Sequence, residues 1–531
     1  KKKVRFLFVF IFFFHSFNSF NQKLYKSLDR DYIIHNEKYI NKFGCNVHTA
    51  VKPLYSFQID SISNIDKNKT WLQRKVMDEN FLISKNPEYY FSFNPIVHLE
   101  IGHEFGSEKY KWNNTRGFVL EGKIGNKLIF TSSFFENQSR FPTYINNFIF
   151  NRNAWIIPGQ GESRWTNDSI FDYSMSSANF TFQPSNYLDI QFGTGKNFIG
   201  DGYRSMILSD NAFNYPYLKL VTSFGKFKYT NLYMEHIDMI SNPSQDITYN
   251  RKYMTLHHLS INISDRLNLG LYETIIWNNI RTPEFSGFDI AYLNPIIFLR
   301  PVEFSLNSSD NYLMGINFKY LINSNSNTYG QFVLDEFSQP SIKNGDGWWG
   351  NKYSFQIGYK YYDLFNISNL ILQIENNYAR PYMYSHVSVN QNYGHYYEPL
   401  SHPLGSNFNE LLVFIDYKYN KWYFNTQYMQ ARYGSKIPGD PTNYGDDIFI
   451  TNSNRPSDYG IYMFQGNDTK LVSCKFSISY LINPTTNLKL EIGHLLRYLN
   501  PQIHHESYSP RITNFTFFAI KSDMFNKYYD F

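Results

Sequence analysis

Long hydrophobic runs are almost missing from this sequence of 531 residues. A membrane protein built from helices needs several runs of roughly 20 apolar residues. Only Val4–Phe14 approaches such a run, and it is too short to span a bilayer. The mean hydropathy of −0.44 agrees with this scarcity. The sequence therefore excludes a bundle of membrane-spanning helices.

Cysteine is nearly missing as well, because the chain has only Cys45 and Cys474. Two cysteines cannot build the disulfide framework of a small secreted domain. Cys474 lies in a pattern typical of a strand position that is buried or faces lipid. A disulfide between the two is therefore the less favoured interpretation.

An excess of positive charge is absent beyond the first few residues. The formal net charge is +5, and Lys1, Lys2, Lys3 and Arg5 supply four of these charges, so the rest of the chain is close to neutral. A nucleic-acid-binding protein has a clustered basic surface. We therefore expect no nucleic-acid partner.

Catalytic and metal-binding signatures are also missing. His103-Glu104 lacks the second histidine of a zinc-protease helix, Gly193–Asn197 lacks the Walker spacing, and no G-x-S-x-G motif occurs. His257-His258 lies in a strand pattern, where neighbours point to opposite faces and cannot share a metal. Asp446-Asp447 invites comparison with barrel proteases, but adjacent acids in a loop are usually just solvated. We predict no enzyme, no cofactor and no metal.

Aromatic residues are abundant instead. The chain has 49 Phe and 45 Tyr, and aromatic residues make up 19% of it. A membrane-spanning strand shows lipid only one of its faces, so half of its residues are free to be polar, and rings collect at both water interfaces. A chain rich in rings yet low in hydropathy is typical of a transmembrane β-barrel.

The clearest strand pattern is Val472–Ile482. Its even positions read Val, Cys, Phe, Ile, Tyr and Ile, and they alternate with mostly polar residues. A period of two over this length is enough to cross a bilayer as a tilted strand. Similar alternation predicts hairpins over 259–271 and 117–134 and a strand over Tyr187–Phe192.

Long polar stretches lie between these compact hairpins, notably Pro381–Asn409 and Ser435–Asp458. Loops of this length are unusual in a compact soluble domain. They are typical of the outer rim of a membrane barrel. We expect both to be extracellular loops.

The two ends of the chain indicate export. Basic Lys1–Arg5, apolar Phe6–Phe14 and polar His15–Gln22 are typical of a secretory signal peptide. We predict a signal peptide over 1–22, an N-terminal periplasmic or plug segment over 23–89, and an outer-membrane β-barrel over 90–531. Phe531, preceded by alternating aromatics, resembles the insertion signal of bacterial outer-membrane proteins.

The stretch Gly193–Pro216 interrupts strand alternation with four glycines. Glycine permits backbone turns that other residues resist. We expect this stretch to fold into the lumen as a plug, where Asp201 and Asp210 are able to pair with Arg204 and Lys196. A plug without a ligand and a ligand-binding site are both open interpretations.

Two further stretches contain candidate site residues. In residues 288–304, prolines interrupt the ladder, and Arg300 and Glu303 lie among apolar residues, where charges need partners or water. We expect both charges to face the lumen. Trp348 and Trp349 offer flat faces for stacking on sugar rings, although an interfacial aromatic girdle is the plainer interpretation.

Several short motifs occur within 193–216 and 288–304 and further along the chain. They are GDGYRS at 200–205, LSDNA at 208–212, YPYLK at 215–219, YLNP at 292–295, RPVEF at 300–304, HPLG at 402–405 and YYDF at 528–531. In these motifs the chain resembles the Wzi-like capsule-assembly family as it occurs in Bacteroidota. Some members look like the gliding-motility protein RemB.

The resemblance implies an antiparallel transmembrane barrel of about 18 strands, plugged inside, that has no enzymatic activity and helps to hold exopolysaccharide at the cell surface. The implied partners are surface polysaccharide, outer-membrane lipid and, in gliding bacteria, motility or secretion machinery. The family's sugar-contacting positions lie in variable outer loops and do not transfer to residues here. A porin-like diffusion channel is the alternative function, and the polar inward loop favours polysaccharide binding over it.

Overall fold

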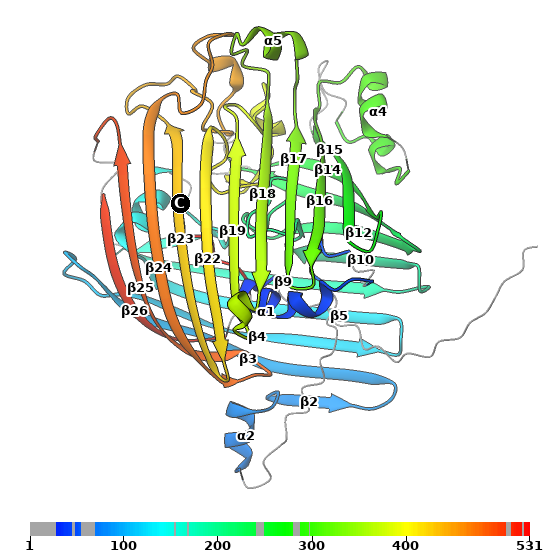
Figure 1. Ribbon diagram of the computed structural model, residues 1–531, viewed down its shortest axis with the longest axis vertical. Helices are drawn as coiled ribbons and strands as arrows, with labels where there is room; N and C mark the ends of the chain where they lie inside the picture. Colours follow the sequence, from blue (N-terminus) through cyan, green and yellow to red (C-terminus); the bar gives the residue numbers. More distant parts are fainter. Residues whose placement is uncertain are drawn as a thin grey trace, which may run out of the picture.

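The computed structural model describes residues 28–44, 48–54, 69–152, 155–166, 169–239, 249–279, 287–296, 298–505, 511–522 and 525–531. Within these ranges, 18 antiparallel strands form a closed barrel (Figure 1). The predicted fold class and strand number are confirmed. The predicted signal peptide and Cys45 lie outside the described residues, and the division at residue 89 stays a prediction.

Each barrel strand pairs with the next along the chain, and the last pairs with the first. The strands are β3 (Tyr89–Glu104), β4 (Lys111–Ile124), β5 (Leu128–Arg140), β9 (Ile170–Phe182), β10 (Leu188–Gly195), β12 (Tyr215–Phe224), β13 (Phe227–Asp238), β14 (Asn250–Asn262), β15 (Leu267–Asn278), β16 (Asn311–Asn323), β17 (Ser326–Leu334), β18 (Tyr353–Tyr362), β19 (Leu370–Ala379), β22 (Phe408–Tyr419), β23 (Trp422–Ser435), β24 (Asn467–Asn483), β25 (Leu488–Pro501) and β26 (Ile512–Ser522). Strands β2 (Leu82–Lys85) and β8 (Arg164–Thr166) add to the edges of β3 and β9.

Short elements occupy the segments between and before the barrel strands. The helices are α1 (Arg30–Ile40), α2 (Trp71–Met77), α3 (Thr143–Asn151), α4 (Leu299–Leu306), α5 (Gln339–Asn344), η1 (Ile290–Leu293), η2 (Leu364–Asn366), η3 (Val389–Gln391) and η4 (Asn452–Asn454). The remaining strands are β1 (Val51–Lys52), β6 (Ile156–Ile157), β7 (Gly161–Glu162), β11 (Phe198–Ile199), β20 (Gly394–His395) and β21 (Glu398–Pro399). Within the described ranges, none of these helices is long and apolar enough to span a bilayer.

Alternation along the strands sorts side chains between lipid and lumen. In β24, Ser473, Ser477 and Ser479 are buried and face the lumen, whereas Phe476 is exposed on the outer face. Cys474 shares that outer face. The predicted hairpins around residues 125–127 and 264–266 are also present. The outward apolar face and inward polar face are those of a membrane barrel.

The two ends of the barrel differ in the length of their connections. One end, the short-turn end, has tight connections such as 225–226 and 420–421. The other, the long-loop end, has connections such as 279–310, 380–407 and 436–466. Figure 1 shows α4 and α5 near the long-loop end, and α2 with β2 at the opposite end.

The final described segment departs from the sequence-based expectation. Strand β26 ends at Ser522, and residues 525–531 form no strand. Phe531 is buried, and its ring lies 3.9 Å from that of Phe148 in α3. Phe531 therefore does not end a membrane strand, because the segment folds back among lumenal side chains, and its role as an insertion signal stays a prediction.

Candidate functional site

The lumen is filled from the connection between β10 and β12. We call residues 196–214 the plug. Met206, Ile207 and Leu208 are fully buried there and belong to a large lumenal core. The backbone N–H of Ser209 donates to the carbonyl of Leu400 at 2.7 Å, so the plug is bonded to a second connection. This geometry agrees with the inward plug expected from the sequence.

Arg204 anchors the plug to the barrel wall. Its guanidinium lies 2.9 Å from the Glu410 carboxylate and 3.1 Å from that of Asp530. Burial opposes the charge, but Asp530 and Glu410 together raise the pKa of Arg204 well above its ordinary value. The Glu375 carboxylate accepts the backbone N–H groups of Tyr203 and Arg204 at 2.7 and 3.0 Å. The plug therefore has a fixed position in the ring.

The other predicted plug charges have different partners from those expected. Lys196 donates to the carbonyls of Gly159 and Asp210 at 2.8 and 3.0 Å. The Asp210 carboxylate accepts from Tyr528 at 2.6 Å, and burial raises its pKa.

Asp201 accepts from Thr49 at 2.5 Å and lies 4.0 Å from Lys319. All four charges lie in the lumen, but Arg204 does not pair with Asp201 or Asp210. Arg204 and Asp201 thus have counter-ions on other segments of the chain, whereas the side-chain hydrogen bonds of Lys196 and Asp210 are to uncharged groups.

A glycine allows the plug backbone to lie close to the barrel wall. A Cβ atom at Gly202 would lie 2.5 Å from a carboxylate oxygen of Glu375 and 2.9 Å from the carbonyl of Arg204. Gly202 does not adopt the left-handed backbone that would require glycine. The glycine-rich sequence predicts turns here, whereas Gly202 instead allows the plug backbone to approach the wall carboxylate of Glu375.

A second connection also fills the lumen, and sequence reasoning missed it. Tyr382, Tyr384 and Tyr393 of connection 380–407 are fully buried. The hydroxyl of Tyr384 donates to the carbonyl of Met206 in the plug at 2.7 Å. The sequence predicts an extracellular loop over Pro381–Asn409. That prediction is wrong for the buried part of the segment, because its rings pack in the lumenal core.

A cavity of about 350 Å³ lies at the long-loop end. Its walls come from α3, from connections 380–407 and 436–466, and from residues 497–499. The lining includes rings, cations, acids and amides, namely Tyr144, Phe148, Tyr397, Tyr433, Phe449, Phe531, Arg152, Arg497, Lys436, Asp446, Asp447, Asn147 and Asn151. We call this space the outer cavity.

The polar groups of the outer cavity are held in place by rings and backbone. Arg152 donates to the carbonyl of Tyr397 at 3.0 Å and lies 4.0 Å above the ring of Phe148. Arg497 donates twice to the main-chain oxygen of Phe531, at 3.1 and 2.9 Å. Its remaining nitrogen, Nη1, is buried and has no hydrogen-bond partner among the described residues. Both guanidinium groups therefore have fixed positions in the wall of the outer cavity.

Burial raises the pKa of both acids of the outer cavity, and Asp446 is partly neutral near pH 7. Burial and the neighbouring Asp447 raise the pKa of Asp446 to about 7. Burial also raises the pKa of Asp447. A protonated carboxyl group both donates and accepts hydrogen bonds, whereas a carboxylate only accepts. Such groups suit the hydroxyls of a neutral or weakly charged ligand.

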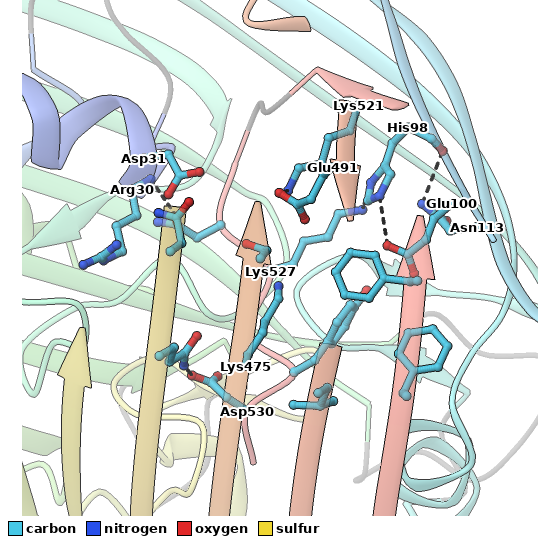
Figure 2. A pocket seen from close by; sticks show the side chains of 18 of the residues that line it. Arg30, Asp31, His98, Glu100, Asn113, Lys475, Glu491, Lys521, Lys527 and Asp530 are labelled. Carbon is cyan, nitrogen blue, oxygen red and sulfur yellow. Dashed lines mark hydrogen bonds and ion pairs between the residues drawn. The ribbon is translucent and has the colours of Figure 1, made fainter. Parts of the chain in front are cut away.

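A second space of about 300 Å³, the inner cavity, lies between α1 and the wall (Figure 2). Figure 2 shows Lys475, Lys521 and Lys527 extending into it from different elements. Each acidic group that lines it has a partner. Asp29 caps α1, and the ion pairs are Asp31–Lys489, Glu100–His98, Asp416–Arg30, Glu491–Lys521 and Asp530–Arg204. Lys475 has no hydrogen-bond or ion-pair partner in the described part of the chain, so the cavity is able to hold an anionic group.

The two remaining pairs of predicted site residues lie apart from the plug. Arg300 and Glu303 are both in α4 and pair with each other at 2.6 Å, and the Arg300 side chain is 58% exposed. The expectation that they face the lumen was wrong, since α4 belongs to a connection outside the wall (Figure 1).

Trp348 and Trp349 are half-buried in the β17–β18 connection. Arg455 lies 4.0 Å above the ring of Trp349, and Tyr382 packs against it edge-on. Neither tryptophan lines the outer cavity.

Metal-ligating side chains do not cluster in the described ranges, where no group of three or more is placed to hold an ion. No protein-family model matches the sequence, and no curated protein is similar to it in sequence.

Solved structures, in contrast, share the fold. The chain is similar to Wzi of Escherichia coli, an outer-membrane protein involved in group 1 capsule assembly and described as a carbohydrate-binding β-barrel, with a TM-score of 0.54 and 11% identity over 94% of this chain and 99% of that one. OprD of Pseudomonas aeruginosa matches with a TM-score of 0.41 and 10% identity over 81% and 94% of the two chains. OccAB2 of Acinetobacter baumannii matches with a TM-score of 0.42 and 10% identity, over 81% of this chain and 97% of that one. The chain therefore has the fold of an outer-membrane β-barrel.

Proposed function

We propose that this protein is a non-enzymatic outer-membrane barrel that binds surface polysaccharide in the outer cavity. The observation that carries the proposal is the combination of rings and fixed polar groups in one cavity at the long-loop end. Ring faces accept the C–H surface of a sugar, and a few placed polar groups orient its hydroxyls. The fold that this chain shares with a carbohydrate-binding barrel supports the proposal.

Binding of the surface polysaccharide purified from the producing strain tests the proposal. Arg152→Gln and Asp446→Ala each remove one polar group of the cavity, and each should weaken binding about tenfold, equivalent to about 1.4 kcal/mol. Arg432→Gln is the matched control, because Arg432 is exposed on the same rim and pairs with Asp468. Absence of binding by the folded, unmodified barrel would overturn the function.

Trp348 and Trp349 form a second proposed contact for the same polysaccharide. Their connection lies at the same end of the barrel, and the tryptophans are only half-buried. If both cavity variants bind normally while the double substitution Trp348→Ala and Trp349→Ala weakens binding, the site lies at the tryptophan pair and not in the cavity. We also propose that polysaccharide retention supports surface spreading, which a gene deletion scored for both properties would test.

A diffusion channel is the second candidate, and the inner cavity is what favours it. That space lies inside the ring and is lined by charged side chains. The plug and connection 380–407 argue against free passage, since both are buried in the lumen. Conductance in planar bilayers separates the two functions, as set out in the Discussion.

A further inference from the structure

The connection between β15 and β16 lies on the outside of the barrel. We call its residues 287–296 and 298–306 the outer strap, which contains η1 and α4. Figure 1 shows α4 beside the outer ends of β14 and β15. The strap is the second stretch that the sequence singled out, and the proposed function assigns it no role.

The wall beneath the strap has a polar row on its outer face. Asn231, His257 and Glu273 lie directly opposite one another in register on β13, β14 and β15. Their neighbours Leu232 and Leu256 belong to the lumenal core, so the row itself points outward. Bare polar and charged groups on the lipid-facing side of a barrel are costly. This row needs a cover.

The strap supplies hydrogen-bond partners to that row. The Glu273 carboxylate accepts the backbone N–H of Leu299 at 3.1 Å, and His257 lies 3.2 Å from the same carboxylate. The Asn231 amide donates to the carbonyl of Pro295 at 2.9 Å. Glu273 and Asn231 therefore bond directly to the strap. His257 is held by Glu273 through Nδ1, and its buried Nε2 has no hydrogen-bond partner among the described residues.

The wall in turn satisfies the strap backbone. The hydroxyl of Tyr233 donates to the carbonyl of Leu293 at 3.0 Å, and that of Thr255 to the carbonyl of Tyr292 at 3.0 Å. The hydroxyl of Tyr229 adds a bond of 2.8 Å to the carbonyl of Pro295. Irregular backbone is tolerated at membrane depth only where its polar groups have partners in the protein. The strap meets this condition on its inner side.

The outer side of the strap is uncovered and mainly apolar, with Arg300 as an exposed charged residue of α4. Ile290, Ile296, Phe298 and Phe304 have exposed fractions of 77%, 83%, 74% and 83%. The adjoining wall residue Met314 is also exposed and apolar. The strap face is thus continuous with the apolar outer face of the barrel.

We propose that the outer strap is embedded in the outer membrane and that its apolar face binds lipid acyl chains. The carbonyls of Tyr292, Leu293 and Pro295 are turned to the wall, and the row at Asn231, His257 and Glu273 lies beneath them. The exposed Arg300 pairs with Glu303 within α4. The strap restores an apolar surface where the wall alone would present an amide, an imidazole and a carboxylate. The proposal does not depend on polysaccharide binding.

Fluorescence quenching by brominated acyl chains tests the proposal. Ile296→Cys, in a protein whose Cys45 and Cys474 are replaced by serine, is labelled with bimane and reconstituted into phosphatidylcholine vesicles with brominated chains. Phe476→Cys on the outer face of β24 is the lipid-facing control, and Tyr459→Cys, exposed in connection 436–466, is the water-facing control. We expect the label at Ile296 to be quenched to the same extent as that at Phe476.

Two results would overturn the proposal. In the first, the label at Ile296 is quenched no more than the label at Tyr459, and a membrane-impermeant thiol reagent modifies the cysteines at both positions. This result would place the strap in water. In the second, Ile296 is neither quenched nor modified and cross-links to another polypeptide, which would make the strap a protein interface. All three cysteine variants change exposed positions, so folding is checked simply by the heat-modifiable mobility of each.

Discussion

Arg204 and Glu410 are 206 residues apart in the chain, yet their side chains meet at 2.9 Å with both fully buried. Asp530 completes the contact from the final described segment. One guanidinium therefore joins the plug, the wall and the chain beyond β26. Removing one partner of a buried ion pair leaves an uncompensated charge, so this contact governs how firmly the plug is held.

Arg204→Met should destabilise the plug by about 3–5 kcal/mol, because Glu410 and Asp530 lose their common counter-ion. Hydrogen exchange of residues 196–214 in the reconstituted protein measures this loss as reduced protection. The control is Arg300→Met, which removes an exposed arginine from α4 and should leave the plug protected. Unchanged exchange in the Arg204 variant would mean that the apolar contacts of the plug suffice.

Ile478→Arg should cost roughly 2–4 kcal/mol, because this outward position of β24 lies near the middle of the apolar face. Ser479→Arg is not a suitable comparison, because Ser479 is buried and donates a hydrogen bond to Glu491 at 2.8 Å. Ser477→Arg is the better comparison, since Ser477 lines the inner cavity. Urea titration, monitored by heat-modifiable mobility on gels, compares the stability of the Ile478 and Ser477 variants. An equal loss of stability in both would contradict the assignment of Ile478 to the outer face.

The unmodified protein should show little steady conductance in planar bilayers, because the plug and connection 380–407 are buried in the lumen. Deleting Lys196–Asp210 removes the plug charges and the Arg204 anchor, and we expect the current to rise. A large, stable current from the unmodified barrel would favour the channel function. A control deletion in the 436–466 connection, outside the plug, should change the current less.

Connection 436–466 should become less stable as the pH rises from about 4 to about 7. The pKa of Asp446 is raised to about 7 in the folded protein, from an ordinary value of 3.8, so the folded state binds the proton more tightly. Stability is therefore highest at low pH and is lost as the pH rises through that interval. Limited proteolysis of the connection measures the trend.

Asp446→Asn should reduce this trend, and the raised pKa of Asp447 accounts for a remainder of the same sign. Asp440→Asn should not reduce it, because hydrogen bonds from Thr442 lower the pKa of Asp440, and its titration falls below the interval. A trend of unchanged size in the Asp446 variant would assign it to another group.

The strands were predictable because lipid imposes a local rule. Every second residue of a spanning strand must be apolar, and Val472–Ile482 shows this in sequence as plainly as β24 does in space. The plug was predictable for a related reason, since Gly193–Pro216 violates the rule. Local sequence therefore predicted both the wall and the place where the chain leaves it.

The partners within the lumen were not predictable in the same way. Arg204 was expected to pair with an acid nearby in sequence, but its partners Glu410 and Asp530 lie in distant segments. Connection 380–407 has the polar composition of an exposed loop, and only the facing residues of the plug make it a core segment. The cover over the polar row at Glu273 was missed because strand pairing decides which polar residues share a face.

The pairing of β26 with β3 has a consequence for how the plug is held. These two strands form the seam at which the ring closes, and residues 525–531 come shortly after β26 in the chain and lie inside the ring. Tyr528 and Asp530 bond to the plug through Asp210 and Arg204. The strand that closes the ring and the contents of the ring are therefore joined by one short stretch of chain, so loss of the contacts of residues 525–531 would loosen the plug while leaving the strand pairs of the wall in place.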